Sequence, residues 1–268
     1  MRRLVLGFAL ALASFCVQAF DHTHAAWDAL LHKHVKYTQN GNASRVDYAG
    51  FNRDHAQLKA VLDDDQKVTR QEFDFWTKPQ QEAFLINAYN ALTVEKILTR
   101  YPEIKSIRDF GSVFGNPWKD KFFRLFGEPA ALDTIEHEML RKDGVYNEPR
   151  VHVAVVCASI GCPMLRNDAF TPEKLEGQLE DGMRRFLSDR TRNRYNPQTK
   201  KLEVSKIFDW YGKDFENGYR GYTSVKATMA KYADLLAQSP EDREAVRGQK
   251  ADIAFLDYDW SLNDSSRS

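Results

Sequence analysis

The sequence predicts a mixed α/β (α+β) fold, a helix-rich single domain around a small central β-sheet. Segments with helical spacing of apolar residues outnumber strand-like segments, and the strand-like segments are scattered between the helices. That order is typical of a mixed domain rather than of a β-sandwich or a helical bundle. No internal repeat, low-complexity linker or second-domain boundary is visible, so residues 20–268 are expected to fold as one globular domain.

Each element is predicted from apolar spacing and from turn residues. Helical spacing predicts helices, and short apolar or alternating runs between turn residues predict strands. The expected helices are, in chain order, 27–35, 57–65, 80–100, a helix that begins at 133, 171–188 and 207–215. The expected strands are 45–51, 121–126, 150–156, 200–204 and 253–260. The helix 80–100 is the clearest, because Thr77 can cap it and Pro79 suits its first turn.

The first residues have the order of a secretory signal peptide. Met1-Arg2-Arg3 is basic, 4–16 is apolar, and Val17-Gln18-Ala19 ends in a small residue. Residues 1–19 are therefore expected to be removed, which leaves a mature chain that begins near Phe20. We expect an exported protein, periplasmic or secreted.

Charge and hydropathy restrict the possible partners. The chain has 38 basic and 38 acidic residues, and loss of Arg2 and Arg3 leaves 36 against 38. Such a balance argues against a nucleic-acid partner, which normally requires an excess of Lys and Arg. No later run approaches the roughly 20 apolar residues of a transmembrane segment. The remaining candidate partner is an unidentified small-molecule or peptide ligand; no cofactor is expected, and the oligomeric state is open.

Cys157 is the first candidate for chemistry. It follows the apolar run 150–156 and opens the loop Cys157-Ala-Ser-Ile-Gly-Cys162-Pro163. Backbone N–H groups in such a loop can lower a thiol pKa or hold a developing oxyanion. Cys162 leaves a second possibility, because a disulfide can link it to Cys157 in an oxidising compartment.

His137 is the candidate general base for the thiol, with Glu136 or a buried amide orienting its ring. Glu136 has an alternative, purely structural role, since Asp133 and Glu136 have the spacing of a helix capping box. His152 lies five residues before Cys157. In a regular strand that odd separation puts the two side chains on opposite faces. His152 is therefore the poorer direct partner of Cys157, unless the strand breaks before Cys157, and it is expected to position the substrate.

Two amides interrupt the apolar face of the helix 80–100. Asn87 and Asn90 are expected to be buried, so each must find hydrogen-bond partners. They are interpreted either as polar braces for a neighbouring loop or as groups that position a substrate. The histidine pairs His22/His24 and His32/His34 lack a carboxylate or cysteine at matching spacing, so no metal site is expected.

Five motifs in fixed order resemble one protein family. The motifs are Leu85-Ile-Asn-Ala-Tyr-Asn-Ala91, Leu132-Asp-Thr-Ile-Glu-His137, His152-Val-Ala-Val-Val-Cys-Ala-Ser159 with Gly161-Cys-Pro163, Ile207-Phe-Asp-Trp-Tyr211, and Tyr258-Asp-Trp-Ser-Leu-Asn263. Together they resemble the domain-of-unknown-function family 547, whose core would cover about residues 70–215. The resemblance implies motif positions but no reaction.

Three functions remain open from the sequence. The first is cysteine-dependent acyl transfer or hydrolysis by a Cys157–His137 pair. The second is a non-catalytic module that binds a ligand or partner through the Asn87/Asn90 helix and the Cys157 loop. The third is thiol–disulfide chemistry, although redox motifs usually place their two cysteines closer than Cys157 and Cys162.

Overall fold

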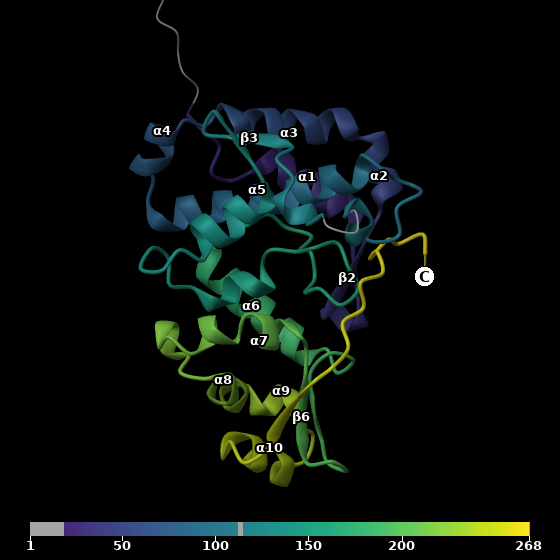
Figure 1. Ribbon diagram of the computed structural model, residues 1–268, viewed down its shortest axis with the longest axis vertical. Coiled ribbons are helices and arrows are strands. Elements are labelled where there is room, and N and C mark those ends of the chain that lie inside the picture. The colour runs from purple at the N-terminus through teal and green to yellow at the C-terminus, as the bar shows by residue number, and fades with distance from the viewer. Residues whose placement is uncertain (1–18, 112–114, 268) are drawn as a thin grey trace, which may run out of the picture.

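A computed structural model describes residues 19–111 and 115–267 (Figure 1). The predicted signal peptide, residues 1–19, lies outside the described residues except for Ala19. Within the described ranges, no helix has the length and apolar character needed to cross a membrane. The helix-rich α+β class is confirmed, because helices account for most of the regular structure and the strands are short.

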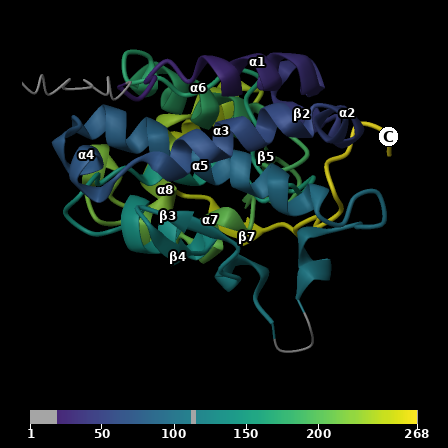
Figure 2. The ribbon, with the colours of Figure 1, turned by 90° about the horizontal axis from the view of Figure 1, so that it is seen from above.

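The N-terminal half is a stack of helices around one buried helix. Its helices are α1 (Ala25–His34), α2 (Tyr48–Arg53), α3 (His55–Lys67), α4 (Arg70–Phe75) and α5 (Lys78–Leu98). As predicted, Thr77 and Gln80 form a capping box at the start of α5. Seventeen of the 21 residues of α5 are buried, as expected for a helix in the middle of a core. In the view from above, α3 lies between α1 and α5 (Figure 2).

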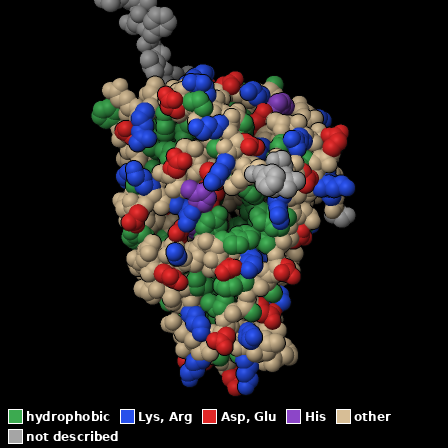
Figure 3. Space-filling model, viewed as in Figure 1, with side chains coloured by type: hydrophobic (Ala, Val, Ile, Leu, Met, Phe, Trp, Pro, Cys, Tyr) green, Lys and Arg blue, Asp and Glu red, His purple; other side chains and the backbone are tan. Residues whose placement is uncertain are grey.

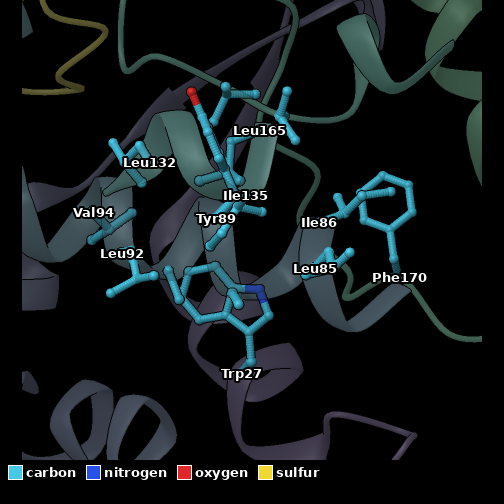
Figure 4. Packing of buried hydrophobic residues seen from close by; sticks show 14 of the residues in the cluster. Trp27, Leu85, Ile86, Tyr89, Leu92, Val94, Leu132, Ile135, Leu165 and Phe170 are labelled. Atoms are coloured by element: carbon cyan, nitrogen blue, oxygen red, sulfur yellow. The ribbon is translucent and has the colours of Figure 1, made fainter. Parts of the chain in front are cut away.

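Side chains from distant segments meet on α5. Figure 4 shows Trp27 of α1 beside Leu85, Tyr89 and Leu92 of α5, with Ile135 on the other side. All five side chains are at least nine-tenths buried. Removing that much apolar surface from water is the main driving force for folding. The segment around Ile135 is thereby fixed against the helix that carries both buried amides.

The strands form three separate small sheets instead of one central sheet. Two are hairpins, β1–β2 and β3–β4, and the third has the order β5–β6–β7 with β6 and β7 parallel. The strands are β1 (Val35–Thr38), β2 (Ala43–Val46), β3 (Phe123–Leu125), β4 (Glu128–Ala130), β5 (Arg194–Asn196), β6 (Lys201–Val204) and β7 (Asp252–Phe255). The centre of the upper half in Figure 1 is therefore α5, not a sheet.

The C-terminal half has its own apolar cluster, and α6 joins it to the first. The helices here are α6 (Leu175–Ser188), α7 (Ile207–Trp210), α8 (Val225–Lys231), α9 (Ala233–Leu236) and α10 (Pro240–Arg247). Leu175 and Leu179 of α6 belong to the cluster around α5, whereas Met183 and Phe186 belong to the lower cluster. One helix therefore supplies side chains to both cores.

Two predicted strands are wrong in the structure. Residues 150–156 do not form a strand: Pro149–Val153 is a 3₁₀ helix, because Pro149 occupies its first turn and the Glu148 carboxylate accepts a hydrogen bond from the Arg150 N–H. Within 45–51, only the end of β2 is a strand, because Asp47 caps α2 by accepting from the Gly50 N–H. In both places a local capping carboxylate decided the backbone conformation.

Candidate functional site

The C-terminal segment after β7 crosses from the lower half to the upper half (Figure 1) and packs on the Cys157 loop. The N–H groups of Ile160 and Gly161 donate to the carbonyls of Ser261 and Asp259, both at 2.8 Å. A Cβ atom at Gly161 would lie 3.0 Å from the backbone N and O of Asp259, so a larger residue would push the C-terminal segment away from the loop. The contact places Tyr258 beside the cysteine.

The Cys157 thiol is half-buried and makes three side-chain contacts. Its Sγ lies 3.1 Å from Ser159 Oγ, Cys162 Sγ and Tyr258 OH. Hydrogen bonding to Cys162, followed by that to Ser159 and Tyr258, lowers the pKa of Cys157 to about 7, although burial opposes the change. Burial raises the pKa of Cys162. Cys157 is therefore the thiol that ionises first.

The backbone next to Cys157 is strained. Ala158 has φ of +60° and is buried, in a region that residues with a Cβ rarely adopt. The Asn263 N–H donates to the Ala158 carbonyl at 3.1 Å, which ties this turn to the C-terminal segment. Such strain persists only where the surroundings impose the conformation, and it is frequent at functional sites.

The two buried amides of α5 act as braces. Asn90 Nδ2 donates to the Ala154 carbonyl, and its Oδ1 accepts from the Val156 N–H, both at 3.0 Å. Asn87 makes the same pair of bonds with the backbone of Phe170, at 2.8 and 3.0 Å. The brace interpretation is confirmed for both residues, and neither lines the cavity described below. Asn90 fixes the chain immediately before Cys157.

His152 belongs to a buried polar group that the sequence did not predict. Its Nε2 donates to Asp214 Oδ2 at 2.7 Å, and its ring stacks on Tyr211 with 3.9 Å between centroids. A carboxylate only accepts hydrogen bonds, so Nδ1 is the unprotonated nitrogen; it is buried and has no hydrogen-bond partner among the described residues. Burial lowers the pKa of His152, against the effect of Asp214, so the ring is neutral near pH 7.

The Asp214 carboxylate accepts hydrogen bonds from two residues, His152 and Arg141. Arg141 Nε donates to Asp214 Oδ2 at 2.6 Å and its Nη2 donates to Oδ1 at 3.1 Å. Although burial opposes it, the hydrogen bonds from His152 and Arg141 keep the pKa of Asp214 well below its ordinary value. The carboxylate therefore stays charged and fixes the orientation of the imidazole.

His137 and Glu136 lie on the π-helix Thr134–Leu140. The hydrogen bond from the His137 ring to Glu136 that the sequence predicts is not found among the described residues. The capping-box interpretation is wrong, since Asp133 makes no side-chain cap bond. Instead, Glu136 is buried and accepts hydrogen bonds from the hydroxyls of Tyr89 and Tyr211. His137 is partly exposed: its Nδ1 accepts from Arg141 and its Nε2 lies 3.6 Å from Asp133 Oδ1.

These groups line one cavity of about 230 Å³. Cys157, Cys162, His137, His152 and Glu136 all face it. Six aromatic side chains form much of the wall: Tyr89, Trp118, Trp210, Tyr211, Tyr258 and Trp260. Figure 3 shows a hydrophobic hollow on the face seen in Figure 1. The cavity lies where the two apolar clusters meet, because its lining residues come from both.

The described residues hold no group of three or more His, Cys, Asp or Glu arranged to bind a metal ion. No histidine nitrogen is among the hydrogen-bond partners of Cys157 within the described part of the chain. The catalytic roles assigned to Cys157, His137 and Glu136 remain predictions. What the structure adds is that all three face the same space.

Sequence reasoning missed three residues of this site: Asp214, Tyr211 and Tyr258. Tyr211 and Tyr258 stand in two of the five motifs, so the motifs contained a signal, but no spacing rule assigned them a role. Asp214 lies 62 residues after its partner His152, outside every motif. Only the folded chain reveals that pair.

The fold and site define a helix-rich α+β protein in which a thiol of lowered pKa faces an aromatic cavity. Residues 73–187 match the family model described as "Protein of unknown function, DUF547", which supports the resemblance to this family. The match begins close to the expected residue 70 but ends before the motif at 207–211. No curated protein and no solved structure matched the chain.

Proposed function

We propose that the protein catalyses acyl transfer or hydrolysis through Cys157. The observation that supports this most is the thiol whose pKa is lowered to about 7, in a cavity that it shares with a neutral imidazole oriented by a carboxylate. A thiolate is the nucleophilic form of cysteine, and this pKa gives a large thiolate fraction at neutral pH. Nucleophile, base and orienting acid are the parts of a cysteine hydrolase.

The proposed reaction has two steps. The imidazole accepts the proton of the Cys157 thiol and becomes an imidazolium. The resulting thiolate attacks the carbonyl carbon of an ester or amide, a C–S bond forms, and the carbonyl electrons move to oxygen. The intermediate collapses with cleavage of the bond to the leaving group, which takes a proton from the imidazolium. Water or an amine then attacks the thioester, the imidazole accepts its proton, and the C–S bond breaks to restore the thiolate.

His152 has stronger geometric support as the base than His137. The free Nδ1 of His152 can accept a proton, and Asp214 stabilises the imidazolium that results. Both ring nitrogens of His137 already face protein groups, Arg141 and Asp133. His137 therefore remains the alternative base, and mutation distinguishes the two.

The Tyr258 hydroxyl is a candidate oxyanion donor beside the loop N–H groups that the sequence predicts, of which that of Ser159 hydrogen-bonds to the Cys157 thiol. In the loop after Cys157, the N–H groups of residues 160, 161 and 162 already donate to carbonyls at 2.8–3.2 Å. The Tyr258 hydroxyl accepts from Ser159 Oγ, so its own proton can point toward the thiol. We propose that this proton stabilises first the thiolate and then the developing oxyanion.

The test is a burst assay with p-nitrophenyl acetate, combined with mass spectrometry of the trapped acetyl-enzyme. We expect acetylation of Cys157 in the native protein, none in Cys157→Ala, and loss of turnover in His152→Gln and Asp214→Asn. His137→Gln is the matched control and is expected to keep most activity. If native protein reacts no faster than unfolded protein, the proposal is wrong, and the alternative of a non-catalytic binding module is favoured.

Export is a separate proposal, supported by the order of residues in 1–19 alone. N-terminal sequencing of the protein recovered outside the cytoplasm tests it, with a start near Phe20 as the expected result. Recovery of the intact Met1 terminus from the cytoplasm alone would overturn it.

A further inference from the structure

We propose that the cavity around Cys157 selects substrates that carry a positively charged ammonium group close to the acyl carbon. The chemical step rests on the acyl-transfer function proposed above, but recognition of the cation does not. The inference comes from the charge and composition of the cavity wall.

The outer part of the wall is a cluster of aromatic rings. Trp210 stacks on Trp260 at 5.6 Å between centroids, Tyr258 lies 4.6 Å from Trp260, and Trp118 lies 5.9 Å from it. Trp210 is 46% exposed, an unusually open position for a tryptophan that lines a cavity. The ring faces carry partial negative charge, so they attract a cation within about 6 Å of the ring centroid.

The inner part contains a carboxylate without a cationic partner. Glu136 is 5% exposed, and its hydrogen bonds come from the neutral hydroxyls of Tyr89 and Tyr211. Among the described residues, no Lys, Arg or His nitrogen lies within ion-pair distance of Glu136. A cation bound in the cavity would meet this buried carboxyl group, which makes no direct ion pair with a described residue. Burial lowers the pKa of the Arg141 guanidinium, but Asp214 and then Glu136, which is close enough to act on it, raise that pKa.

The other carboxylate of the cavity lining adds to the negative charge of Glu136. Asp133 is the second carboxylate on the wall, and no Lys or Arg is among the described lining residues. Arg141 is the nearest guanidinium to this region in the hydrogen-bond network, but Asp214 and His137 occupy it. An anion would therefore meet two carboxylates. The guanidinium groups of Arg141 and Arg108 lie over the Tyr211 and Trp260 rings, at 4.9 and 5.2 Å from the centroids, and neither is a lining residue of the cavity. A neutral sugar would stack on the tryptophans but would leave Glu136 unpaired.

The geometry relates the ammonium group to the reaction. Cys157, Glu136 and the aromatic rings face the same cavity of about 230 Å³, a space for one small organic molecule, since a cavity of about 150 Å³ already holds benzene. A cation held by Glu136 would thus lie near the carbonyl that Cys157 attacks. A free α-amino group or a short aminoalkyl chain on the acyl group fits this description.

The test measures protection of Cys157 in the full chain against iodoacetamide, which is uncharged. Tetramethylammonium chloride is the probe, and the comparison compounds are tert-butanol, sodium acetate and methyl glucoside at equal ionic strength. We expect saturable protection by tetramethylammonium and none by the other three. Quenching of tryptophan fluorescence gives a second readout that does not need a reactive thiol.

Two variants test whether Glu136 and Trp210 bind the cation, and a third variant is the control. Glu136→Gln is expected to weaken tetramethylammonium binding at least about tenfold, because it removes one member of a close charge pair. Trp210→Leu, at a half-exposed position, is expected to weaken binding without unfolding the protein. Glu82→Gln is the matched control, since Glu82 is equally buried but does not line the cavity, and its binding should be unchanged.

Protection by tert-butanol or methyl glucoside equal to that by tetramethylammonium would overturn the inference, as would binding that Glu136→Gln and Trp210→Leu leave unaffected. The two proposals fail separately. If tetramethylammonium binds but p-nitrophenyl acetate is not turned over, the cation site stands and the acyl-transfer function does not. If p-nitrophenyl acetate is turned over but tetramethylammonium does not bind, the acyl-transfer function stands and the cation site does not.

Discussion

Replacement of Cys162 by alanine tests the origin of the low pKa of Cys157. The hydrogen bond between the two sulfur atoms, at 3.1 Å, is the largest cause of that low pKa. A hydrogen bond to a charged group contributes about 1.5–3 kcal/mol, and about 1.36 kcal/mol corresponds to one pH unit. Loss of the Cys162 donor should therefore raise the pKa of Cys157 from about 7 by roughly one to two pH units.

The direction of the pH dependence follows from the thiolate form. A thiol with a lowered pKa is reactive above that pKa and loses its reactivity as the pH falls below it. In the native protein, alkylation of Cys157 by iodoacetamide should rise with pH with a midpoint of about 7. In Cys162→Ala, the rate at pH 7 should be roughly five- to fifty-fold lower, and the plateau at high pH should be unchanged.

Peptide mapping by mass spectrometry assigns the alkylated residue, and Cys157→Ser gives the background. Ser159→Ala is the comparison variant, because Ser159 makes a smaller contribution to the same pKa. An unchanged midpoint in Cys162→Ala would refute the reasoning. A native midpoint near the ordinary thiol pKa would refute it as well.

Two further predictions concern the loop and the sulfur pair. Asn90→Ala should destabilise the protein by about 2–4 kcal/mol in urea unfolding, because a buried N–H and a buried carbonyl lose their partner, and it should slow Cys157 alkylation. Asn87→Ala should destabilise similarly but leave alkylation unchanged, since it braces Phe170; equal effects of both variants on alkylation would contradict this role. Mild oxidation with diamide should link Cys157 to Cys162, with reversal by dithiothreitol, because a modest approach of the sulfurs suffices; persistence of two free thiols would exclude the link.

Part of the site could be predicted from the sequence because its signals are local. Helical spacing and the Thr77 cap define α5, so two amides on its apolar face had to be buried and bonded. Cys157 could be selected because it opens a loop with a glycine after a buried run. The error at 150–156 has the same local origin. A short apolar run does not distinguish a strand from a helical turn, and the cap at Glu148 decided the outcome.

The sequence by itself determined the fold class, the central helix α5 and the cysteine, since these depend on periodicity and capping within a few residues. Only the tertiary structure decided which groups surround the thiol. Tyr258 reaches Cys157 from 101 residues away, and Asp214 reaches His152 across 62 residues. Such pairs depend on how the C-terminal segment and the lower core pack against α5. Packing of distant segments leaves no periodic signal along the chain.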